Sequence, residues 1–310
     1  MAATVTLKRT GAKMPLVGFG LWKTVYNAIK SGYRLFDGAA DYGNEKEAGE
    51  GIARAIKDGL VTREDVWITS KLWNSYHEKD RVEEGARKSL ALWGLDYFDL
   101  YLIHFPISIE YIDPKVKFPQ EWWGLDGKIH PINVPYQDTW HEIEALVDKG
   151  LTKNIGMSNA QGSLIYDVQR YARIEPQVLQ VEIHPYLTQN ALIDYCKLLG
   201  IAITAYSSFG PQSYLELGGG KSAASLLQHD LIAGIASKTS KSTAQVLLRW
   251  AIQKGLAVIP KSNSHERLLE NLAITDFELT SDDIKSIDAL NINLRLNDPA
   301  DLDPRLAIFA

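Results

Sequence analysis

The feature that most constrains this sequence is a repeated unit. In each unit, a short apolar run gives way to a polar residue and then to an amphipathic stretch. Eight such runs occur: Val17–Gly20, Tyr33–Phe36, Val66–Ser70, Phe98–Ile103, Asn154–Met157, Val178–Val181, Ile201–Ala205 and Ala257–Pro260. Helical spacing of apolar residues predicts helices over Glu45–Asp58, Lys79–Trp93, Tyr136–Lys149, Gly162–Tyr171, Gln189–Leu199 and Ser242–Lys254. Apolar runs alternating with helices are typical of parallel strands buried under helices.

The number and spacing of these units predict a barrel. Most runs follow one another at the spacing of a βα unit, about 30 residues. Two wider gaps predict long loops, Phe105–Pro135 after the fourth strand and Phe209–Leu226 after the seventh. Eight βα units favour a closed (β/α)8 TIM barrel over an open doubly wound sheet. A turn at Thr10 and Gly11 predicts an opening β-hairpin that caps the bottom of the barrel. No low-complexity linker divides the sequence, so we expect residues 1–310 to form one domain.

Composition excludes several classes of protein. With 33 Lys and Arg against 38 Asp and Glu, the formal net charge is −5, which argues against a nucleic-acid partner. No apolar run approaches the ~20 residues that span a bilayer, and the first residues lack the layout of a signal peptide. We therefore expect no membrane partner and a cytoplasmic location. Cys196 is the one cysteine, which excludes an intramolecular disulfide and a CxxC metal site, and we expect a buried, inert thiol. The seven histidines are scattered, so no metal site is expected.

Four polar side chains follow the second, third and fourth predicted strands: Asp37, Tyr42, Lys71 and His104. In a TIM barrel the carboxyl ends of the strands converge on the active-site face. The reference pKa of tyrosine is ~10, and a nearby ammonium lowers that pKa, so Lys71 held by Asp37 would make Tyr42 a better proton donor. His104 could orient a carbonyl oxygen or relay the proton. Each residue alone fits a structural role better, as an ion pair or a rim aromatic. Together they favour proton transfer to a carbonyl.

Eight segments resemble the aldo-keto reductase superfamily: GFGLW (18–22), LFDGAADYGNE (35–45), TSKLWN (69–74), LYLIHFP (100–106), GMSN (156–159), VEIHPYL (181–187), AYSSFGP (205–211) and IPKSN (259–263). They occur in order over nearly the whole sequence, which makes the resemblance specific. SSFGPQS (207–213), IPKSNSHERLLEN (259–271) and LRLNDP (294–299) most resemble fungal xylose reductases. The resemblance implies reduction of an aldose in its open form, with D-xylose giving xylitol. It also implies the catalytic tetrad Asp37, Tyr42, Lys71 and His104, with Tyr42 as general acid.

A hydride donor is then required, because tyrosine and lysine cannot supply one. The sequence has no P-loop and no Rossmann fingerprint, and Gly49-Glu50-Gly51 fits helix packing better. The resemblance implies NADPH, with NADH as an open option, extended across the barrel mouth. For the nicotinamide it implies Ser158, Asn159, Gln180 and Tyr206, and for the pyrophosphate Ser207, Phe209 and Ser213. For the 2′-phosphate it implies Lys261, Ser262, Asn263 and Arg267, for the adenine Glu270 and Asn271, and for the ribose hydroxyls of NADH Glu216. Two cations and a hydroxyl suit a phosphate.

For a small-molecule aldose or aldehyde substrate, the resemblance implies Trp22, Asp41, His104, Phe105 and Asn297. Asp41 and Asn297 would bond sugar hydroxyls, and the aromatic rings would offer an apolar wall. Trp122 and Trp123 either shape the rim of this site or anchor their own loop, and we favour the loop.

The sequence differs from the family pattern at one place above all. Relatives usually carry about ten more residues after the position of Lys23, so we expect a shortened first βα loop and first helix. Whether this impairs cofactor binding is open. In addition, Ala160 replaces a usual phenylalanine near the nicotinamide site.

Three other functions stay open. A Schiff-base lyase would use Lys71 or Lys261 on the same barrel and would need no nicotinamide. A non-enzymatic regulatory subunit would bind the cofactor without turnover. The enzyme could also act on L-arabinose, galactose or another aldehyde. Fungal relatives are often dimers, which leaves a homodimer as an open option.

Overall fold

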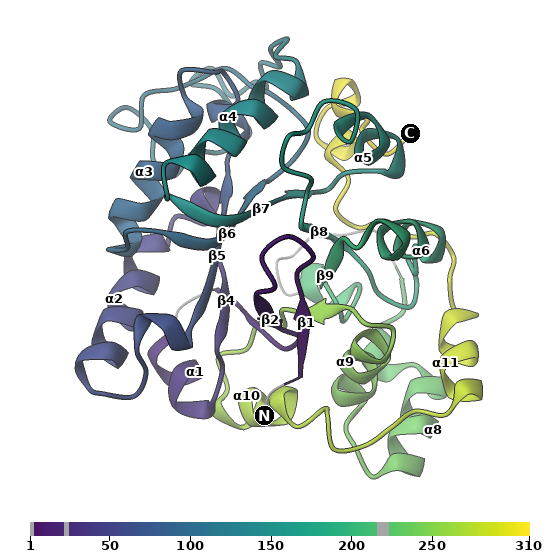
Figure 1. Cartoon of the computed structure of the whole chain (residues 1–310). Coiled ribbons are helices and arrows are strands. Elements are labelled where there is room, and N and C mark those ends of the chain that lie inside the picture. The colour runs from purple at the N-terminus through teal and green to yellow at the C-terminus, as the bar shows by residue number, and fades with distance from the viewer. Residues whose placement is uncertain (1–2, 22–24, 216–222) are drawn as a thin grey trace.

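The computed structural model describes residues 3–21, 25–215 and 223–310, apart from the side chains of Ser213 and Leu215. Eight strands form one parallel sheet in sequence order (Figure 1). They are β3 (Phe19–Gly20), β4 (Leu35–Asp37), β5 (Trp67–Leu72), β6 (Phe98–Ile103), β7 (Thr152–Ser158), β8 (Val178–Glu182), β9 (Ala202–Tyr206) and β10 (Ala257–Val258).

The first and last strands meet, so the sheet closes into the predicted barrel. Val17, just before β3, forms a parallel bridge with Val258 of β10, and the Gly18 N–H donates to the Val258 carbonyl at 2.8 Å. A Cβ at Gly20 would lie 2.8 Å from the Ile259 carbonyl oxygen. Glycine is therefore required where β3 passes the end of β10.

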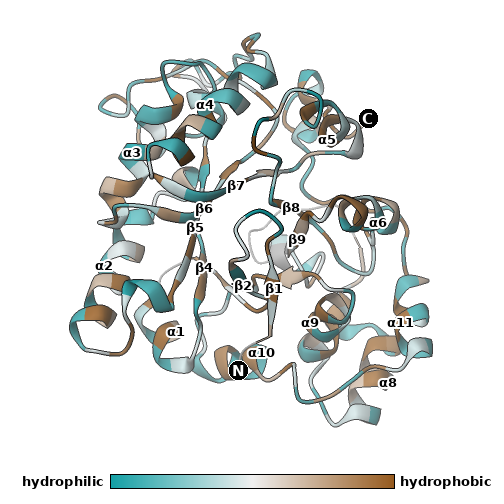
Figure 2. Ribbon diagram, in the orientation of Figure 1, coloured by the Kyte–Doolittle hydropathy of each residue, from teal (hydrophilic) through white to brown (hydrophobic). Residues whose placement is uncertain are grey.

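Helices cover the outside of the barrel. They are α1 (Val25–Ser31), α2 (Glu45–Lys57), α3 (Val82–Trp93), α4 (Tyr136–Asp148), α5 (Gly162–Val168), α6 (Asn190–Leu199), α7 (Gln212–Leu215), α8 (Asp230–Thr239), α9 (Thr243–Gln253), α10 (His265–Leu272) and α11 (Ser281–Asp288). The covering helices carry both hydrophobic and hydrophilic residues, as elements with one buried side should (Figure 2). Gly49 of α2 packs directly against the Trp93 backbone of α3, since a Cβ there would lie 2.3 Å from the Trp93 oxygen. The prediction of a packing role for this glycine is confirmed.

The amino-terminal hairpin closes the bottom of the barrel, as predicted. Strands β1 (Thr4–Thr6) and β2 (Lys13–Pro15) are antiparallel and lie across the middle of the ring of strands in Figure 1. Leu7 and Met14 are buried in a small core with residues from the first halves of the barrel strands, among them Leu35, Trp67 and Val178. Burial of these side chains ties the hairpin to the strand starts.

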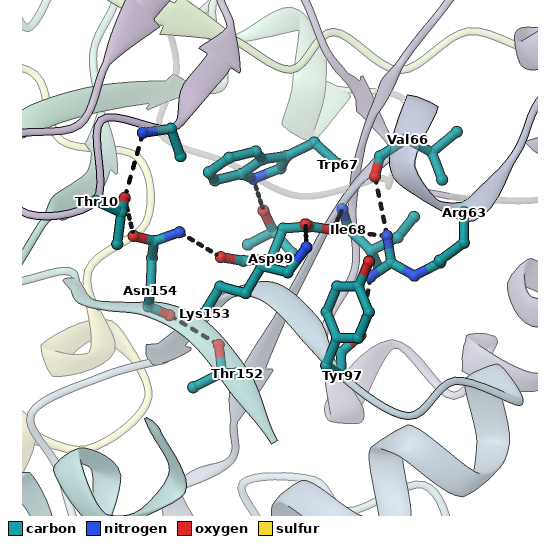
Figure 3. Close-up of polar contacts among 12 residues, drawn as sticks. Thr10, Arg63, Val66, Trp67, Ile68, Tyr97, Asp99, Thr152, Lys153 and Asn154 are labelled. Atoms are coloured by element: carbon teal, nitrogen blue, oxygen red, sulfur yellow. Dashed lines mark hydrogen bonds and ion pairs between the residues drawn. The ribbon is translucent and has the colours of Figure 1, made fainter. Parts of the chain in front are cut away.

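A polar network accompanies this apolar plug at the bottom of the barrel (Figure 3). Asp99, near the start of β6, accepts from Arg63 Nη1 at 2.8 Å and from the Ile68 N–H at 3.0 Å. The Tyr97 ring lies between the Arg63 guanidinium and the Lys153 ammonium, each 4.0 Å from its centroid. We call Asp99, Arg63, Tyr97 and Lys153 the bottom network.

Two features of the predicted layout need correction. The polar residues expected just after the strands lie inside them: Asp37, Ser158, Glu182 and Tyr206 are terminal strand residues, and Lys71 precedes the last residue of β5. Strand pairing is made by backbone groups, so the register continues through polar residues, as where Glu182 pairs with Tyr206. The wide gap after the seventh strand also contains a whole helix, α8, besides the loop.

The short first helix was predicted, and α1 has seven residues. The loop Phe105–Pro135 lies between β6 and α4, also as predicted. Among the described residues, no helix combines the length and apolar character that crossing a membrane requires.

Candidate active site

A buried ion pair joins β4 and β5 at the carboxyl end of the barrel. Lys71 Nζ lies 2.5 Å from Asp37 Oδ1 and donates to the Gly38 carbonyl at 2.9 Å. The Lys71 side chain is fully buried and that of Asp37 is 3% exposed. Burial lowers the pKa of Lys71, but the negative charges facing it, Asp37 first, outweigh burial and raise the pKa above its usual value. The ammonium is therefore held charged.

Tyr42 stands over this pair on a 3-10 turn, Ala40–Tyr42, that follows β4. Its hydroxyl lies 3.4 Å from Lys71 Nζ. Tyr42 as a residue is 39% exposed, although its hydroxyl lies beside the fully buried Lys71 side chain. This arrangement presents a phenolic proton at the barrel mouth.

Lys71 lowers the pKa of Tyr42, as predicted, but burial outweighs its effect, so the expected net decrease needs correction. Burial raises the pKa of the Tyr42 phenol to about 12, and the Asp37 and Asp41 carboxylates act in the same direction. Lys71 lowers that pKa through its charge and its hydrogen bond, but by less. The phenol thus keeps its proton throughout the neutral range, as a general acid must.

His104 follows β6 and faces the same mouth. Its Nδ1 lies 3.2 Å from Asp41 Oδ1, close but without the alignment of a hydrogen bond. The His104 and Tyr42 rings are 6.0 Å apart between centroids, in an edge-to-face arrangement. The structure therefore brings together all four residues of the predicted tetrad, with Asp41 beside them.

An aromatic wall borders His104. Trp73, which follows β5, lies 5.4 Å from the His104 ring, and Phe105 stacks on that ring at 4.9 Å. Trp122 packs on both Trp73 and Phe105, at 5.2 and 5.0 Å. These contacts fit either role considered for Trp122, shaping the rim of the site or anchoring its loop. Trp73 was missed, although its place in the TSKLWN segment, two residues after Lys71, was a signal.

Two amide side chains link this centre to the next strands. Gln180 of β8 donates from Nε2 to Asp37 Oδ2 at 2.6 Å. Asn159 donates from Nδ2 to the His104 carbonyl at 2.9 Å and accepts from the Tyr206 hydroxyl at 2.6 Å. Ser158 and Gln180 are Cα partners across β7 and β8. The four residues implied for the nicotinamide are thus contiguous with the tetrad.

Two further segments at the mouth carry the remaining residues implied for the cofactor. After β9, Ser207 adopts a left-handed φ of 53°, and Phe209 packs against the main core. After β10, Lys261 and Arg267 are exposed and Ser262 is buried around the start of α10. Within this segment, Asn263 is exposed, Glu270 half-buried and Asn271 buried. Trp22 and Glu216 lie outside the described residues, as does the side chain of Ser213.

Asn297 reaches the site from the carboxyl-terminal segment. Its Nδ2 donates to the Tyr206 hydroxyl at 3.1 Å. The backbone of this segment is held by Glu182, the last residue of β8, which accepts from the Leu296 and Asn297 N–H groups at 2.9 Å each. We did not predict a role for Glu182.

Two buried groups lie away from the tetrad, and Cys196 has the buried, inert character predicted for it. Cys196 is buried in α6, and burial raises the pKa of its thiol to about 12. His184 is fully buried, and its Nε2 lies 2.8 Å from Glu182 Oε1. No cluster of three or more potential metal ligands occurs in the part of the sequence that the structure describes.

Comparison with known proteins bears on this geometry. The Aldo/keto reductase family profile matches residues 21–292. A probable NAD(P)H-dependent D-xylose reductase of Emericella nidulans is 54% identical, with 97% of each protein covered. The NAD(P)H-dependent D-xylose reductase of Aspergillus niger is also 54% identical, with 96% of this chain and 97% of that protein covered.

Solved structures agree in fold. The aldose reductase of Schistosoma japonicum has a TM-score of 0.88 at 32% identity, covering 99% of this chain and 98% of that one. A Bombyx mori aldo-keto reductase in complex with NADP has a TM-score of 0.88 at 35% identity, covering 99% of each. With a closed barrel, a Tyr–Lys–Asp–His centre at its mouth and full-length relatives above half identity, this chain belongs to the aldo-keto reductase family.

Proposed function

We propose that this protein is an NADPH-dependent aldose reductase that takes the open form of D-xylose and converts it to xylitol. The single observation that carries the proposal is the Asp37–Lys71–Tyr42 arrangement, a protonated phenol on a buried ammonium at the barrel mouth. The xylose reductases of E. nidulans and A. niger support the choice of substrate.

Tyr42 acts as the general acid. As the aldehyde carbon is reduced, its carbonyl oxygen gains negative charge and takes the phenolic proton. The phenolate left behind lies beside Lys71 Nζ, whose charge stabilises it. Asp37 holds that ammonium in place, and His104 lies where it can orient the carbonyl oxygen. NADPH, when bound, supplies the hydride.

The side chains of β7 and β8 fit a nicotinamide carboxamide, which offers one acceptor and two donor hydrogens. Ser158 Oγ accepts from Asn159 Nδ2 at 3.2 Å, and its own proton can be donated. Gln180 uses Nε2 on Asp37, and no hydrogen bond among the described residues uses its Oε1. A hydroxyl donor and an amide acceptor on partnered residues of adjacent strands thus match the carboxamide. Asn159 and Tyr206 complete this group.

The start of α10 fits the 2′-phosphate of NADPH. Lys261 and Arg267 place two cations on the exposed side of this segment. The Ser262 hydroxyl accepts from the Ser264 N–H at 3.1 Å, and Ser264 caps the helix. Charge-assisted bonds from these cations would favour NADPH over NADH.

Asp41 and Asn297 are the proposed partners of sugar hydroxyls, and Phe105 with Trp73 and Trp122 forms the apolar wall. Asp41 stands beside His104, and Asn297 beside Tyr206, so the two polar groups flank the tetrad. A sugar in its open form needs both kinds of surface.

The first experiment measures NADPH consumption with D-xylose, beside fluorescence quenching by NADPH alone. Turnover and quenching are both expected, and turnover would show that the short first loop is tolerated. Quenching without turnover across several aldehydes would overturn the reductase and favour a cofactor-binding regulatory subunit. A much higher kcat/KM for L-arabinose or galactose than for D-xylose would identify that sugar as the substrate instead. A borohydride-trapped adduct on Lys71 would favour a lyase.

Cofactor choice has a separate test. Lys261→Met and Arg267→Ala should each weaken NADPH binding by about tenfold or more, because one charge-assisted bond contributes roughly 1.5–3 kcal/mol. The affinity for NADH should stay nearly unchanged. Quenching titrations with both cofactors measure this. Equal weakening would mean that these residues do not bind the 2′-phosphate.

We also propose that residues 1–310 act as one domain, since every strand of the barrel and its covering helices come from the same continuous order of elements. The cytosol as compartment and the homodimer stay predictions. Gel filtration with light scattering tests the second.

A further inference from the structure

Glu182 is a buried carboxylate that the proposed chemistry does not use. It ends β8, its side chain has no exposed surface, and its register partner on β9 is Tyr206. Ionised carboxylates are rarely buried unless hydrogen bonds compensate the lost solvation. The hydrogen-bond partners of Glu182 therefore indicate its role.

The compensating donors come from the carboxyl-terminal segment and from His184. Oε1 accepts from the Leu296 N–H at 2.9 Å and lies 2.8 Å from His184 Nε2, while Oε2 accepts from the Asn297 N–H at 2.9 Å. The Glu182 backbone oxygen in turn accepts from Gln189 Nε2 at 2.6 Å. One side chain thus fixes two consecutive backbone amides of a segment more than 100 positions away in the sequence.

The consequence is the placement of the Asn297 amide. From that fixed backbone, Asn297 Nδ2 donates to the Tyr206 hydroxyl, which donates to Asn159 Oδ1. Asn159 Nδ2 then donates to the His104 carbonyl. A continuous series of hydrogen bonds therefore runs from the Glu182-held segment to the catalytic centre.

We propose that Glu182 is a positioning residue for sugar recognition, holding Asn297 where its amide can meet a substrate hydroxyl. This inference rests on the proposed function, because Asn297 is taken there as a partner of the sugar. Glu182 touches neither the reacting carbonyl nor the tetrad. The Tyr206–Asn159 and Asn159–His104 bonds do not involve Glu182 and remain when it is replaced. Its loss should therefore raise KM for a hydroxylated aldehyde and leave kcat and cofactor affinity nearly unchanged.

Glu182→Gln is the informative variant. Glutamine keeps the shape but offers one acceptor oxygen, and its NH2 would face one of the three donors. Glu144→Gln is the matched control: Glu144 is also buried, and it accepts a backbone N–H, that of Ile174, at 2.7 Å on the α4 side of the barrel. A general loss of stability would affect both variants alike.

The assay compares D-xylose with butanal, an aldehyde without hydroxyls. We expect Glu182→Gln to raise KM for D-xylose about tenfold, the effect of losing roughly one hydrogen bond, with KM for butanal and the NADPH dissociation constant within twofold. Glu144→Gln should change neither KM. Adding Asn297→Ala to Glu182→Gln should raise the KM for xylose no further, because both changes remove the same contact.

Hydrogen exchange at the Leu296 and Asn297 amides separates this inference from the proposed function. Exchange at both should accelerate at least tenfold in Glu182→Gln, whatever the protein reduces. A wild-type protein that turns over no aldehyde would contradict the proposed function alone. Unchanged exchange, or an equal rise in KM for xylose and butanal, would overturn the role of Glu182.

Discussion

The two ends of the barrel use the same residue types for different purposes. At the mouth, Asp37, Lys71 and Tyr42 form a carboxylate, an ammonium and a phenol in contact. At the bottom, Asp99, Arg63, Lys153 and Tyr97 form the equivalent set (Figure 3). Both sets join neighbouring elements of the sheet through a buried aspartate.

The difference lies in which part of the tyrosine meets the cation. The Tyr97 ring is flanked by two cations at 4.0 Å, which stabilises the ring where it stands. At Tyr42 the hydroxyl lies 3.4 Å from Lys71 Nζ, and the ring centroid is 5.1 Å from that ammonium, farther than the cations at Tyr97 are from its ring. A ring held between two cations contributes to stability. A tyrosine hydroxyl beside an ammonium can instead donate its proton, because the ammonium compensates the negative charge of the phenolate that forms.

The largest effect is expected for Lys71→Met. The change leaves the Asp37 carboxylate buried without its cation, which costs about 4 kcal/mol of unfolding free energy. Reduction should fall by about 10³-fold as well, because the phenolate loses its stabilising charge. Urea unfolding and NADPH consumption measure the two losses.

Lys153→Met is the control, since the Lys153 side chain is 52% exposed. It should lower neither the free energy of unfolding nor the rate of reduction by much. Comparable losses in both variants would contradict the proposed functional difference between the mouth and the bottom of the barrel.

Asp99→Asn should have a smaller and purely structural effect. Asparagine still accepts from Ile68 and Arg63 but loses the ion pair, which is 16% exposed on the arginine side, so we expect about 2 kcal/mol of destabilisation. The kcat should stay within twofold. If kcat fell tenfold in protein that is still folded, the bottom network would be coupled to the chemistry.

His77, which follows β5, extends the comparison to a buried group without a counter-ion. Burial, with the His104 charge acting in the same direction, lowers the pKa of His77 to about 3. The unfolded protein binds a proton near pH 6.5 that the folded protein does not, so stability falls as pH drops from about 6.5 toward 3. Between pH 7 and 5 the free energy of unfolding should fall by roughly 2 kcal/mol through this group. The His77→Gln variant should lack that part of the pH dependence. Urea unfolding at both pH values tests it. An identical pH dependence in the variant would assign the loss to other groups.

The smallest expected effect is that of Tyr97→Leu. It removes two cation–π contacts at a half-buried site, each worth about 0.5–1 kcal/mol, so about 1 kcal/mol of stability should be lost. A thermal melt measures it. A loss of stability above about 3 kcal/mol would mean that Tyr97 stabilises the bottom of the barrel through more than its two cation–π contacts.

The barrel could be predicted from the sequence because each strand is a separate apolar run, but four helices were missed: the short α7, inside the predicted loop, and α8, α10 and α11. The first turn of α8 is capped by the His229 ring, which accepts from the Leu231 N–H and is not a usual cap. α10 begins just after the KSN segment, which we had interpreted through its phosphate-binding residues without assigning a helix to it. α11 did carry a signal, since Thr280 and Asp283 form a capping box.

At the site, the tetrad could be predicted because its members lie at successive strand ends. The bonds between Glu182 and the Leu296–Asn297 backbone could not, because they join residues 114 and 115 positions apart through main-chain groups that no residue type reveals. The packing of Trp122 on Phe105 likewise depends on how a long loop folds back. The pKa of Tyr42 could not be foreseen either, since it depends on how burial compares with the charge of Lys71.

The central claim is that a tyrosine hydroxyl does chemistry at one end of this barrel and none at the other. The most direct measurement is kcat/KM for D-xylose reduction in Tyr42→Phe beside Tyr97→Phe, with NADPH quenching to confirm that both variants bind cofactor. We expect Tyr42→Phe to lose about 10³-fold and Tyr97→Phe to stay within twofold. Unchanged turnover in Tyr42→Phe, with cofactor binding intact, would contradict the account.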